Sequence, residues 1–404
     1  MNGNSQQASD PVNADKFVTS CQKIMKILML NYEFPPIGGG AGKAHLCLLK
    51  EYAGKNGLTI DVLTSSPQPG FTTTQFTENI TIYKVGIRKK NLHYWRRSEV
   101  LEWLFRAGSR YCRMIKSGGY DLVHAFFGFP TGLLCWKTKR KLPYIISLRG
   151  SDVPGYNVRL GMDYLILAPI FRKIWKSASL VIANSSGLAE LAGKFTPHID
   201  IPVISNGIYT GRFYPANDTS LHQPIRVLTV GRLISRKRID LLIKATAVAK
   251  TIDFDLELSI AGDGNLTEEL KKLAADFDVS ERVKFLGRIP AEDMPQVYRE
   301  HDIFLMSSLH EGMSNAMLEA MASSLPIVTT RCEGVDELVA NNGIVVDRAD
   351  AKSIVDAIKT LAEDKQLYEQ MCAAAREQAK NFTWTAVANK YLDCYHEVIN
   401  QESE

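Results

Sequence analysis

The sequence predicts an α/β protein of two domains, each built around a doubly wound parallel sheet with helices on both faces. Short apolar runs alternate with longer stretches of helical pattern along nearly the whole chain, the order expected for parallel strands joined by helices. The length of 404 residues also exceeds what one hydrophobic core usually organises. One polar stretch interrupts the alternation near the middle of the chain, so two separate cores are expected.

The expected strands fall on either side of this polar stretch. Those before it are ILMLN (27–31), LTIDVLTS (58–65), ITIYKVG (80–86), DLVHAFF (121–127), PYIISLRG (143–150), SLVIANS (179–185) and IPVISNG (201–207). Those after it are IRVLTVGR (225–232), LELSIAGDG (256–264), RVKFLGR (282–288), DIFLMSS (302–308), LPIVTT (325–330) and GIVVD (343–347).

The boundary is expected in YTGRFYPANDTSLHQP, whose Gly, Pro and Asn residues are typical of linkers. The expected organisation is a loose tail (1–22), a first domain (23–208), the linker (209–224), a second domain (225–382) and a C-terminal helix (383–404), for which packing back on the first domain is one option. Ligands of open parallel sheets bind beyond the carboxyl ends of the strands, so a nucleotide is expected in the cleft between the domains.

Composition narrows the class of protein. A net charge of +4 is too small to indicate a nucleic-acid partner. The seven cysteines include no C-x-x-C pair, which favours a reducing compartment over a disulfide framework or a zinc site. Residues 1–23 lack the apolar centre of a signal peptide, and no apolar run approaches the length of a membrane span. A cytoplasmic protein is therefore expected.

Basic residues are concentrated in 88–116, around Trp95, Trp103 and Phe105. Such a segment can mark a surface that contacts anionic lipid or an acidic acceptor, which would place the protein peripherally on the inner face of a membrane. The more common explanation of the pattern is a solvated helix with a buried apolar stripe.

The stretch PPIGGGAGK (35–43) resembles a phosphate-binding loop, but Ile37 and Ala44 occupy the positions that need Gly and a hydroxyl residue. It is better described as a glycine-rich turn that opens a helix. Such a turn lets the backbone approach an anionic ligand, and the helix N-terminus adds free amides.

Two further stretches predict a phosphate and sugar site. In EGMSNAMLEAM (311–321), Glu311 follows a strand, Ser314 or Asn315 can cap the next helix, and Glu319 lies about one turn inside it. Free amides can bind phosphate, and a carboxylate can accept hydrogen bonds from a ribose diol. In GRLISRKRID (231–240), Arg232 and Lys237 can hold phosphate oxygens without a metal.

Together these motifs resemble glycosyltransferase family 4, whose retaining members have the two-domain GT-B architecture. The resemblance extends from Ile24 to about Tyr395. The motifs, in order, are PP-x-x-GG (Pro35, Pro36, Gly39, Gly40), NG-x5-F-x-P (Asn206, Gly207, Phe213, Pro215), GR-x4-K (Gly231, Arg232, Lys237), AGDG (261–264), FLG (285–287) and E-x7-E (Glu311, Glu319).

The resemblance implies a nucleotide-sugar donor held mainly by the second domain. The implied donor-binding residues are Arg232 and Lys237 for the diphosphate, Glu319 for the ribose, the backbone of Arg288 and Ile289 for the base, the amides of Met313, Ser314 and Asn315 for the phosphates, and Gly39, Gly40 and Asn206. Glu311 would address the sugar ring as a catalytic residue.

The sequence departs from the family pattern at two positions. Arg149 replaces a histidine that many relatives place close to the transferred sugar, and it either takes over by stabilising charge or marks a local departure. Arg238 replaces the glycine that commonly follows the clamp lysine, which a helix start is expected to tolerate. Lys43 is expected to be a first-turn surface residue. His124, at a strand end, either contacts acceptor or is a hydrogen-bonded structural histidine.

The expected reaction is transfer of a hexose from a nucleotide diphosphate sugar to a hydroxyl-bearing sugar or glycolipid acceptor, with retention of the anomeric configuration. No Asp-x-Asp motif or His/Cys cluster supplies a metal site, so neither a metal nor another cofactor is expected. The alternatives are a sugar phosphorylase or a nucleotide-sugar epimerase of the same architecture, a non-catalytic sugar-nucleotide binding module and, against the Ile37 and Ala44 departures, a P-loop kinase.

Overall fold

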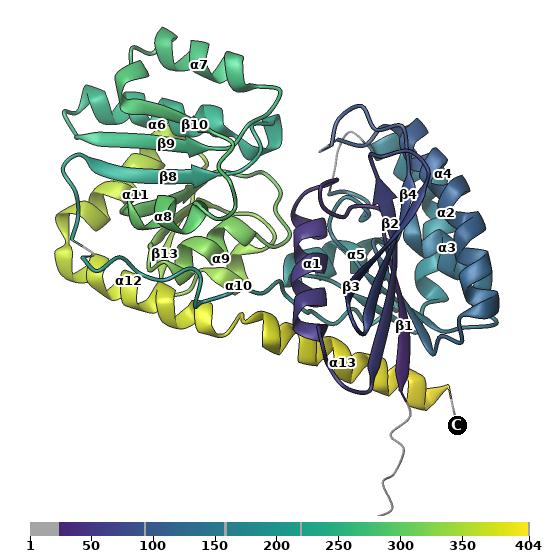
Figure 1. Ribbon diagram of the computed structural model, residues 1–404. Helices are drawn as coiled ribbons and strands as arrows, with labels where there is room; N and C mark the ends of the chain where they lie inside the picture. Colours follow the sequence, from purple (N-terminus) through teal and green to yellow (C-terminus); the bar gives the residue numbers. More distant parts are fainter. Residues whose placement is uncertain (1–23, 93, 157–159, 219, 403–404) are drawn as a thin grey trace, which may run out of the picture.

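The computed structural model describes residues 24–92, 94–156, 160–218 and 220–402. It confirms the predicted fold class, with one sheet in each half of the chain and helices packed around both (Figure 1). The expected tail at 1–22 lies outside the described residues.

The first sheet has the strand order β3-β4-β2-β1-β5-β6-β7. Its strands are β1 (Met25–Asn31), β2 (Leu58–Ser66), β3 (Phe71–Thr77), β4 (Ile80–Gly86), β5 (Leu122–Phe126), β6 (Tyr144–Ser147) and β7 (Leu180–Ile182). All pairings are parallel except that of β3 with β4. Its helices are α1 (Gly40–Tyr52), α2 (Arg97–Ser117), α3 (Thr131–Thr138), α4 (Gly161–Lys176) and α5 (Ser186–Phe195).

One expectation about these strands is wrong, and one strand was not predicted. The run 201–207 is not a strand, and only Val203 in it forms a bridge, to Ala183. The edge strand β3 carries the threonine-rich sequence FTTTQFT, most of it exposed, and so lacks the apolar run by which the other strands were predicted. An edge strand needs only one partner and one covered face, and its sequence signal is correspondingly weak.

The second sheet has the order β10-β9-β8-β11-β12-β13, and all of its pairings are parallel. Its strands are β8 (Ile225–Val230), β9 (Leu256–Ala261), β10 (Val283–Gly287), β11 (Ile303–Met306), β12 (Ile327–Thr330) and β13 (Gly343–Val346). The α-helices that follow β8 are α6 (Ile239–Thr251), α7 (Thr267–Asp276), α8 (Met294–Arg299), α9 (Asn315–Ala322), α10 (Val335–Leu338), α11 (Ala351–Glu363), α12 (Lys365–Lys380) and α13 (Trp384–Gln401).

The final helix returns to the first domain. α12 packs on the second domain, whereas Trp384, Tyr391 and Tyr395 of α13 are buried in the first hydrophobic core (Figure 1). The chain therefore crosses between the domains twice. The two crossings lie side by side, because Ile208 forms a parallel bridge with Thr383 and its amide donates to the carbonyl of Phe382 at 2.6 Å.

Candidate active site

The beginning of α9 lies at the interface between the two domains. Ser314 is the N-cap, and its hydroxyl accepts a hydrogen bond from the Met317 amide at 3.3 Å. Asn315, the first residue of α9, accepts a hydrogen bond from the Asn206 side-chain amide of the first domain at 2.8 Å. The cap places the first amides of α9 at the strand edge where an anionic ligand is expected.

Glu311 and the basic loop after β8 are in direct contact. Lys237 ends a short 3₁₀ turn (Ser235–Lys237), and its ammonium group forms an ion pair with the Glu311 carboxylate. The Ser307 hydroxyl donates to the carbonyls of Lys237 and Arg238, at 3.0 and 2.9 Å, and so fixes the loop to the end of β11. The structure thus brings together the predicted sugar residue and one residue of the predicted diphosphate clamp.

Arg238 is in the left-handed conformation, with φ of +51°. This explains why glycine is common at the position, because a left-handed conformation costs a residue with a side chain roughly 1–2 kcal/mol. Arg238 does lie at a helix start, as expected, because it is the N-cap of α6, but its left-handed conformation gives the side chain a cost that the sequence pattern did not indicate. Its guanidinium group pairs with Asp240 in the first turn of α6, which offsets part of the cost.

Glu319 is almost fully buried and makes two side-chain contacts. The Tyr298 hydroxyl donates to one carboxylate oxygen at 3.0 Å, and the Lys43 ammonium group contacts the other at 2.5 Å. Burial, followed by the nearby carboxylate, raises the pKa of Tyr298 well above its usual value, so this hydroxyl remains a donor. Lys43 lies in the first turn of α1 with a half-exposed side chain, but it also bridges to the predicted ribose-binding carboxylate.

The glycine-rich turn approaches the same helix end. Gly38 has φ of +98°, Gly39 caps α1, and Gly40 is the first residue of α1. A Cβ atom at Gly40 would lie 3.4 Å from the side-chain nitrogen of Asn315. The turn therefore lies directly against the N-terminus of α9, from the opposite domain.

Glu33 is a site residue that sequence reasoning missed. It lies shortly before Pro35 and Pro36 in the sequence. A Cβ atom built on Gly38 would lie 2.7 Å from the Cβ atom of Glu33. Burial raises the pKa of the Glu33 carboxyl group, and the charge of Arg232 acts in the opposite direction. Glu33 thus places a carboxylate of the first domain within electrostatic range of the predicted clamp. An acid two residues before the proline pair was the available signal.

Arg149 begins a hydrogen-bonded chain that crosses the interface. Its guanidinium group donates to the Asn206 side-chain oxygen at 3.0 Å and to the Tyr391 hydroxyl at 3.2 Å. Asn206 in turn donates to Asn315. The backbone amide of Arg149 is held by the buried carboxylate of Asp152 at 2.9 Å. Arg149 is therefore linked to the start of α9 through a single side chain.

Two further residues position the Glu311 loop. The Tyr156 hydroxyl, from the first domain, accepts a hydrogen bond from the Gly312 amide at 3.1 Å. The Glu333 carboxylate accepts one from the Glu311 amide at 3.0 Å and contacts His310 at 2.6 Å. Neither residue was predicted, because both act on backbone or neighbouring groups from distant parts of the sequence.

His124 does not lie where an acceptor could contact it. The side chain is fully buried in β5, with one ring nitrogen 2.7 Å from the Tyr395 hydroxyl and the other 2.7 Å from the Ser147 hydroxyl. Burial lowers its pKa well below the usual value, so the ring is neutral. The structural alternative describes this histidine, and the acceptor interpretation was wrong because α13 covers the strand end.

The expected base-binding residues follow the edge strand β10. Arg288 is exposed and Ile289 is half buried. The neighbouring strand ends are tightly packed, since the Gly262 amide donates to the Gly287 carbonyl at 2.7 Å and the Gly231 amide to the Ala261 carbonyl at 3.0 Å. This packing brings the segment at Arg288 close to the clamp loop that contains Arg232.

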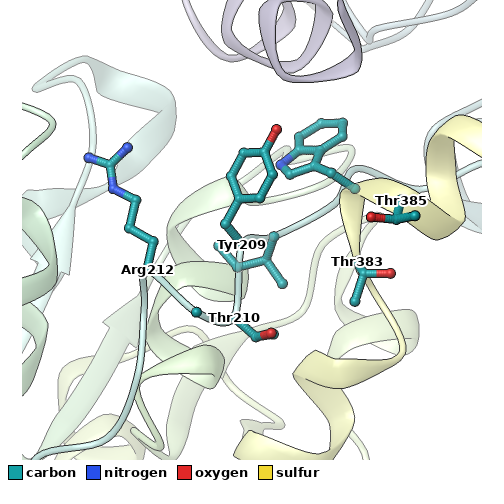
Figure 2. Close-up of a pocket in the computed structure, with 8 residues that line it drawn as sticks. Tyr209, Thr210, Arg212, Thr383 and Thr385 are labelled. Atoms are coloured by element: carbon teal, nitrogen blue, oxygen red, sulfur yellow. The ribbon is translucent and has the colours of Figure 1, made fainter. Parts of the chain in front are cut away.

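A hollow of about 490 Å³ lies elsewhere, where the linker passes the start of α13. Figure 2 shows Tyr209 and Thr210 of the linker near Thr383 and Thr385, with the Arg212 side chain pointing away from these two threonines. None of the predicted site residues lines it. Its place between the two chain crossings associates it with the domain connection rather than with the site at α9.

Among the described residues, no three His, Cys, Asp or Glu side chains are grouped as a metal site requires. Across the same residues, no helix combines the length and the apolar character that crossing a bilayer requires.

Comparison with known proteins identifies relatives over both domains. Residues 38–212 match the family model described as Glycosyltransferase Family 4, and residues 214–378 match the model described as Glycosyl transferases group 1. The lipopolysaccharide core biosynthesis glycosyltransferase LpsE of Rhizobium meliloti is 31% identical over 252 residues, which cover 60% of this chain and 72% of LpsE. A GDP-mannose-dependent phosphatidylinositol monomannoside mannosyltransferase of Mycolicibacterium smegmatis is 31% identical, over 68% of this chain and 76% of its own.

Solved structures show the same fold. Sucrose-phosphate synthase from Thermosynechococcus elongatus superposes with a TM-score of 0.81 at 20% identity, covering 93% of this chain and all of its own. Anabaena HepE, in complex with UDP-glucose, superposes with a TM-score of 0.71 at 19% identity, covering 92% of this chain and all of its own. The two family models match the two domains in order, and the similar proteins are glycosyltransferases of the same architecture. The chain therefore belongs to glycosyltransferase family 4, with the GT-B fold.

Proposed function

We propose that this glycosyltransferase transfers a hexose from a nucleotide diphosphate sugar to a hydroxyl group, with retention of the anomeric configuration and without a metal ion. The acceptor would belong to glycan, glycolipid or polysaccharide biosynthesis. The observation that supports this proposal most directly is the arrangement at α9. Both carboxylates of the E-x7-E motif, Glu311 and Glu319, contact lysines beside the helix N-terminus.

The arrangement supports a division of the donor along this edge. The diphosphate would lie between the α9 amides and the side chains of Arg232 and Lys237, where positive charge is already in place. The ribose would reach Glu319, displacing or sharing the Lys43 ammonium group. The base would lie against the segment at Arg288 and Ile289. Gly39 and Gly40 would approach the transferred sugar and phosphate; a Cβ atom at Gly39 would meet nothing within 4 Å, whereas Gly40 already lies against Asn315.

The proposed reaction follows from this placement. The acceptor oxygen forms a bond to C1 of the sugar from the face that the diphosphate leaves, while the bond from C1 to the β-phosphate oxygen breaks. The departing diphosphate keeps that electron pair, and one of its oxygens takes the acceptor proton. Arg232 and Lys237 stabilise the charge on the diphosphate, which is the main contribution such fixed positive groups make to a barrier. Glu311 lies beside Lys237, where its charge can steady a developing positive centre on the sugar ring.

The names of similar proteins support the substrate classes. HepE was solved in complex with UDP-glucose. The name of the mycobacterial relative includes GDP-mannose and a phosphatidylinositol monomannoside. These names favour a nucleotide sugar as donor and a sugar or glycolipid as acceptor, without selecting the base or the hexose.

The experiment has two parts. A thermal-shift screen of nucleotide sugars finds the donor, because a ligand at 100 times its dissociation constant stabilises the folded state by about 2.7 kcal/mol. Transfer from that donor to lipid-linked and free sugars is then followed by NMR of the anomeric proton. An inverted product contradicts retention. Release of sugar phosphate that depends on inorganic phosphate identifies a phosphorylase, and interconversion of donor without acceptor identifies an epimerase.

Glu311→Gln tests the catalytic assignment within this function. The substitution keeps the size of the side chain and removes its charge, so binding of nucleoside diphosphate should remain nearly unchanged. Transfer should fall at least tenfold, which corresponds to about 1.4 kcal/mol of barrier. Unchanged transfer under saturating donor would exclude a role for the Glu311 charge.

A further inference from the structure

Two helices of the first domain, α2 and α4, expose large apolar side chains. On α2, Leu101 is 64% exposed and Phe105 is 83% exposed. On α4, Met162, Leu165 and Ile166 are 67%, 73% and 71% exposed. Side chains of this size are seldom left in water together on a soluble domain, and a contiguous group of them usually marks an interaction surface.

The two groups approach each other at the N-terminal ends of α2 and α4, while α3 packs against both helices. The Arg97 guanidinium group at the start of α2 contacts the Asp163 carboxylate at the start of α4 at 2.9 Å. Both helices follow strands of the same parallel sheet, so they run in the same direction (Figure 1). Leu101 lies about one turn beyond Arg97 on α2, and Ile166 lies about one turn beyond Asp163 on α4. We call the five exposed residues on α2 and α4 the apolar surface.

Basic side chains border the apolar surface. α2 and α4 together contain eight arginines and lysines but three acidic residues, whereas the whole chain has a net charge of only +4. All three acids are already paired, Glu99 with Lys89, Glu102 with Arg106 and Asp163 with Arg97. Arg113, Lys116, Arg172, Lys173 and Lys176 are exposed toward the C-terminal ends of these helices.

The structure also corrects the expectation for the segment 88–116. Trp103 is buried in the first core and Trp95 is half buried, so of the three aromatic residues only Phe105 is well exposed. α2 thus has both the buried stripe of the common explanation and two exposed apolar residues. Most of the apolar surface comes from α4, which the segment 88–116 does not include.

We propose that α2 and α4 dock this protein on a bilayer that contains anionic lipid, with the apolar surface inserted among the headgroups and acyl chains. An apolar centre with a basic border matches an interfacial membrane site. A nucleic acid would leave the apolar centre without a partner. A two-fold dimer would bring two copies of this basic surface into one interface and is disfavoured by like charge.

Docking in this way suits the site at α9. The N-terminal turns of α2 and α4 lie at the carboxyl edge of the first sheet, as do Gly39 and Arg149. An acceptor carried by a lipid would therefore arrive at the edge where transfer is proposed. Docking itself does not depend on the proposed reaction and can be measured without donor.

Flotation of the full-length protein with vesicles tests the docking. Vesicles of phosphatidylcholine are compared with vesicles that also contain phosphatidylglycerol. The wild-type protein should bind the mixed vesicles at least tenfold more tightly. Leu165→Gln combined with Ile166→Gln should weaken that binding at least tenfold. Arg172→Glu combined with Lys173→Glu should remove the preference for phosphatidylglycerol.

A matched control replaces exposed apolar residues elsewhere. Ile252→Gln with Phe277→Gln alters side chains that are 50% and 44% exposed at the ends of α6 and α7, and binding should stay at the wild-type value. Urea unfolding verifies that each variant is folded. Wild-type protein that binds both vesicles equally, or a Leu165 and Ile166 variant that retains full binding, overturns the proposal. Self-association of the free protein that this variant abolishes, together with unchanged vesicle binding, would assign the surface to a dimer instead.

Discussion

Glu319→Ala is the sharpest test of the proposed donor site, because the free protein already satisfies this carboxylate. Loss of hydrogen bonds between a charged group and a ribose diol costs roughly 1.5–3 kcal/mol. Lys43 holds the carboxylate before the ligand arrives, and an ion pair whose lysine is half exposed to water contributes about 0–1 kcal/mol. Binding of the ribose therefore gains only the difference between these two free energies, so we use the lower part of the roughly 1.5–3 kcal/mol range. We expect about 1.5–2 kcal/mol, which is roughly a 10- to 30-fold weaker affinity for nucleoside diphosphate.

The variant should remain folded. The Tyr298 hydroxyl, which loses its contact with Glu319, also lies 3.2 Å from the carbonyl of Ala316 and keeps that acceptor. The half-exposed Lys43 ammonium group regains water. Urea unfolding with and without ligand separates a loss of stability from a loss of affinity.

Isothermal titration calorimetry with UDP and GDP, beside the full donor found in the screen, gives the affinities. Glu311→Ala is the matched control, because it removes a carboxylate from the same interface and should leave nucleoside diphosphate affinity nearly unchanged. The reasoning is refuted if Glu311→Ala abolishes nucleoside diphosphate binding while Glu319→Ala leaves it intact. In that case the roles of the two carboxylates are exchanged, whatever the reaction.

Three other predictions address the metal, the domain connection and pH. EDTA should leave donor affinity unchanged, since Arg232 and Lys237 supply the charge; loss of binding that magnesium or manganese restores would contradict this. Gly207→Ala should lower the free energy of unfolding by about 1–3 kcal/mol, because the new methyl group would lie 2.7 Å from the Trp384 backbone; an unchanged urea midpoint would show that the two crossings can separate freely. Burial lowers the pKa of His45 to about 3 and that of His124 well below its usual value. Their contribution to stability is therefore complete above the unfolded pKa near 6.5 and declines below it, by up to about 1.4 kcal/mol per pH unit for each histidine. Urea unfolding between pH 7.5 and 5.5 should show a smaller slope for His124→Gln than for wild type, and equal slopes would refute the assignment.

Local patterns in the sequence were sufficient for the fold class. Parallel strands buried on both faces require continuous apolar runs, so strands such as β1 and β8 are visible without any knowledge of their partners. The E-x7-E spacing placed one carboxylate in a loop and the other one turn inside a helix, and the structure has both there. The edge strand β3 was not predicted from the sequence, because its exposed threonines leave no apolar run.

Contacts between distant segments required the tertiary structure. Lys43 meets Glu319 across 276 positions and His124 meets Tyr395 across 271, and no local pattern carries such pairings. The same holds for Glu33, whose carboxylate matters because folding brings it near Arg232, and for Arg149, which reaches α9 through Asn206. The apolar surface belongs to this class too, since α2 and α4 are separate helices in the sequence and their N-terminal ends meet, through Arg97 and Asp163, only in the folded domain. Secondary structure follows from short-range periodicity, whereas the neighbours of a functional side chain depend on which strand ends the sheet order places together.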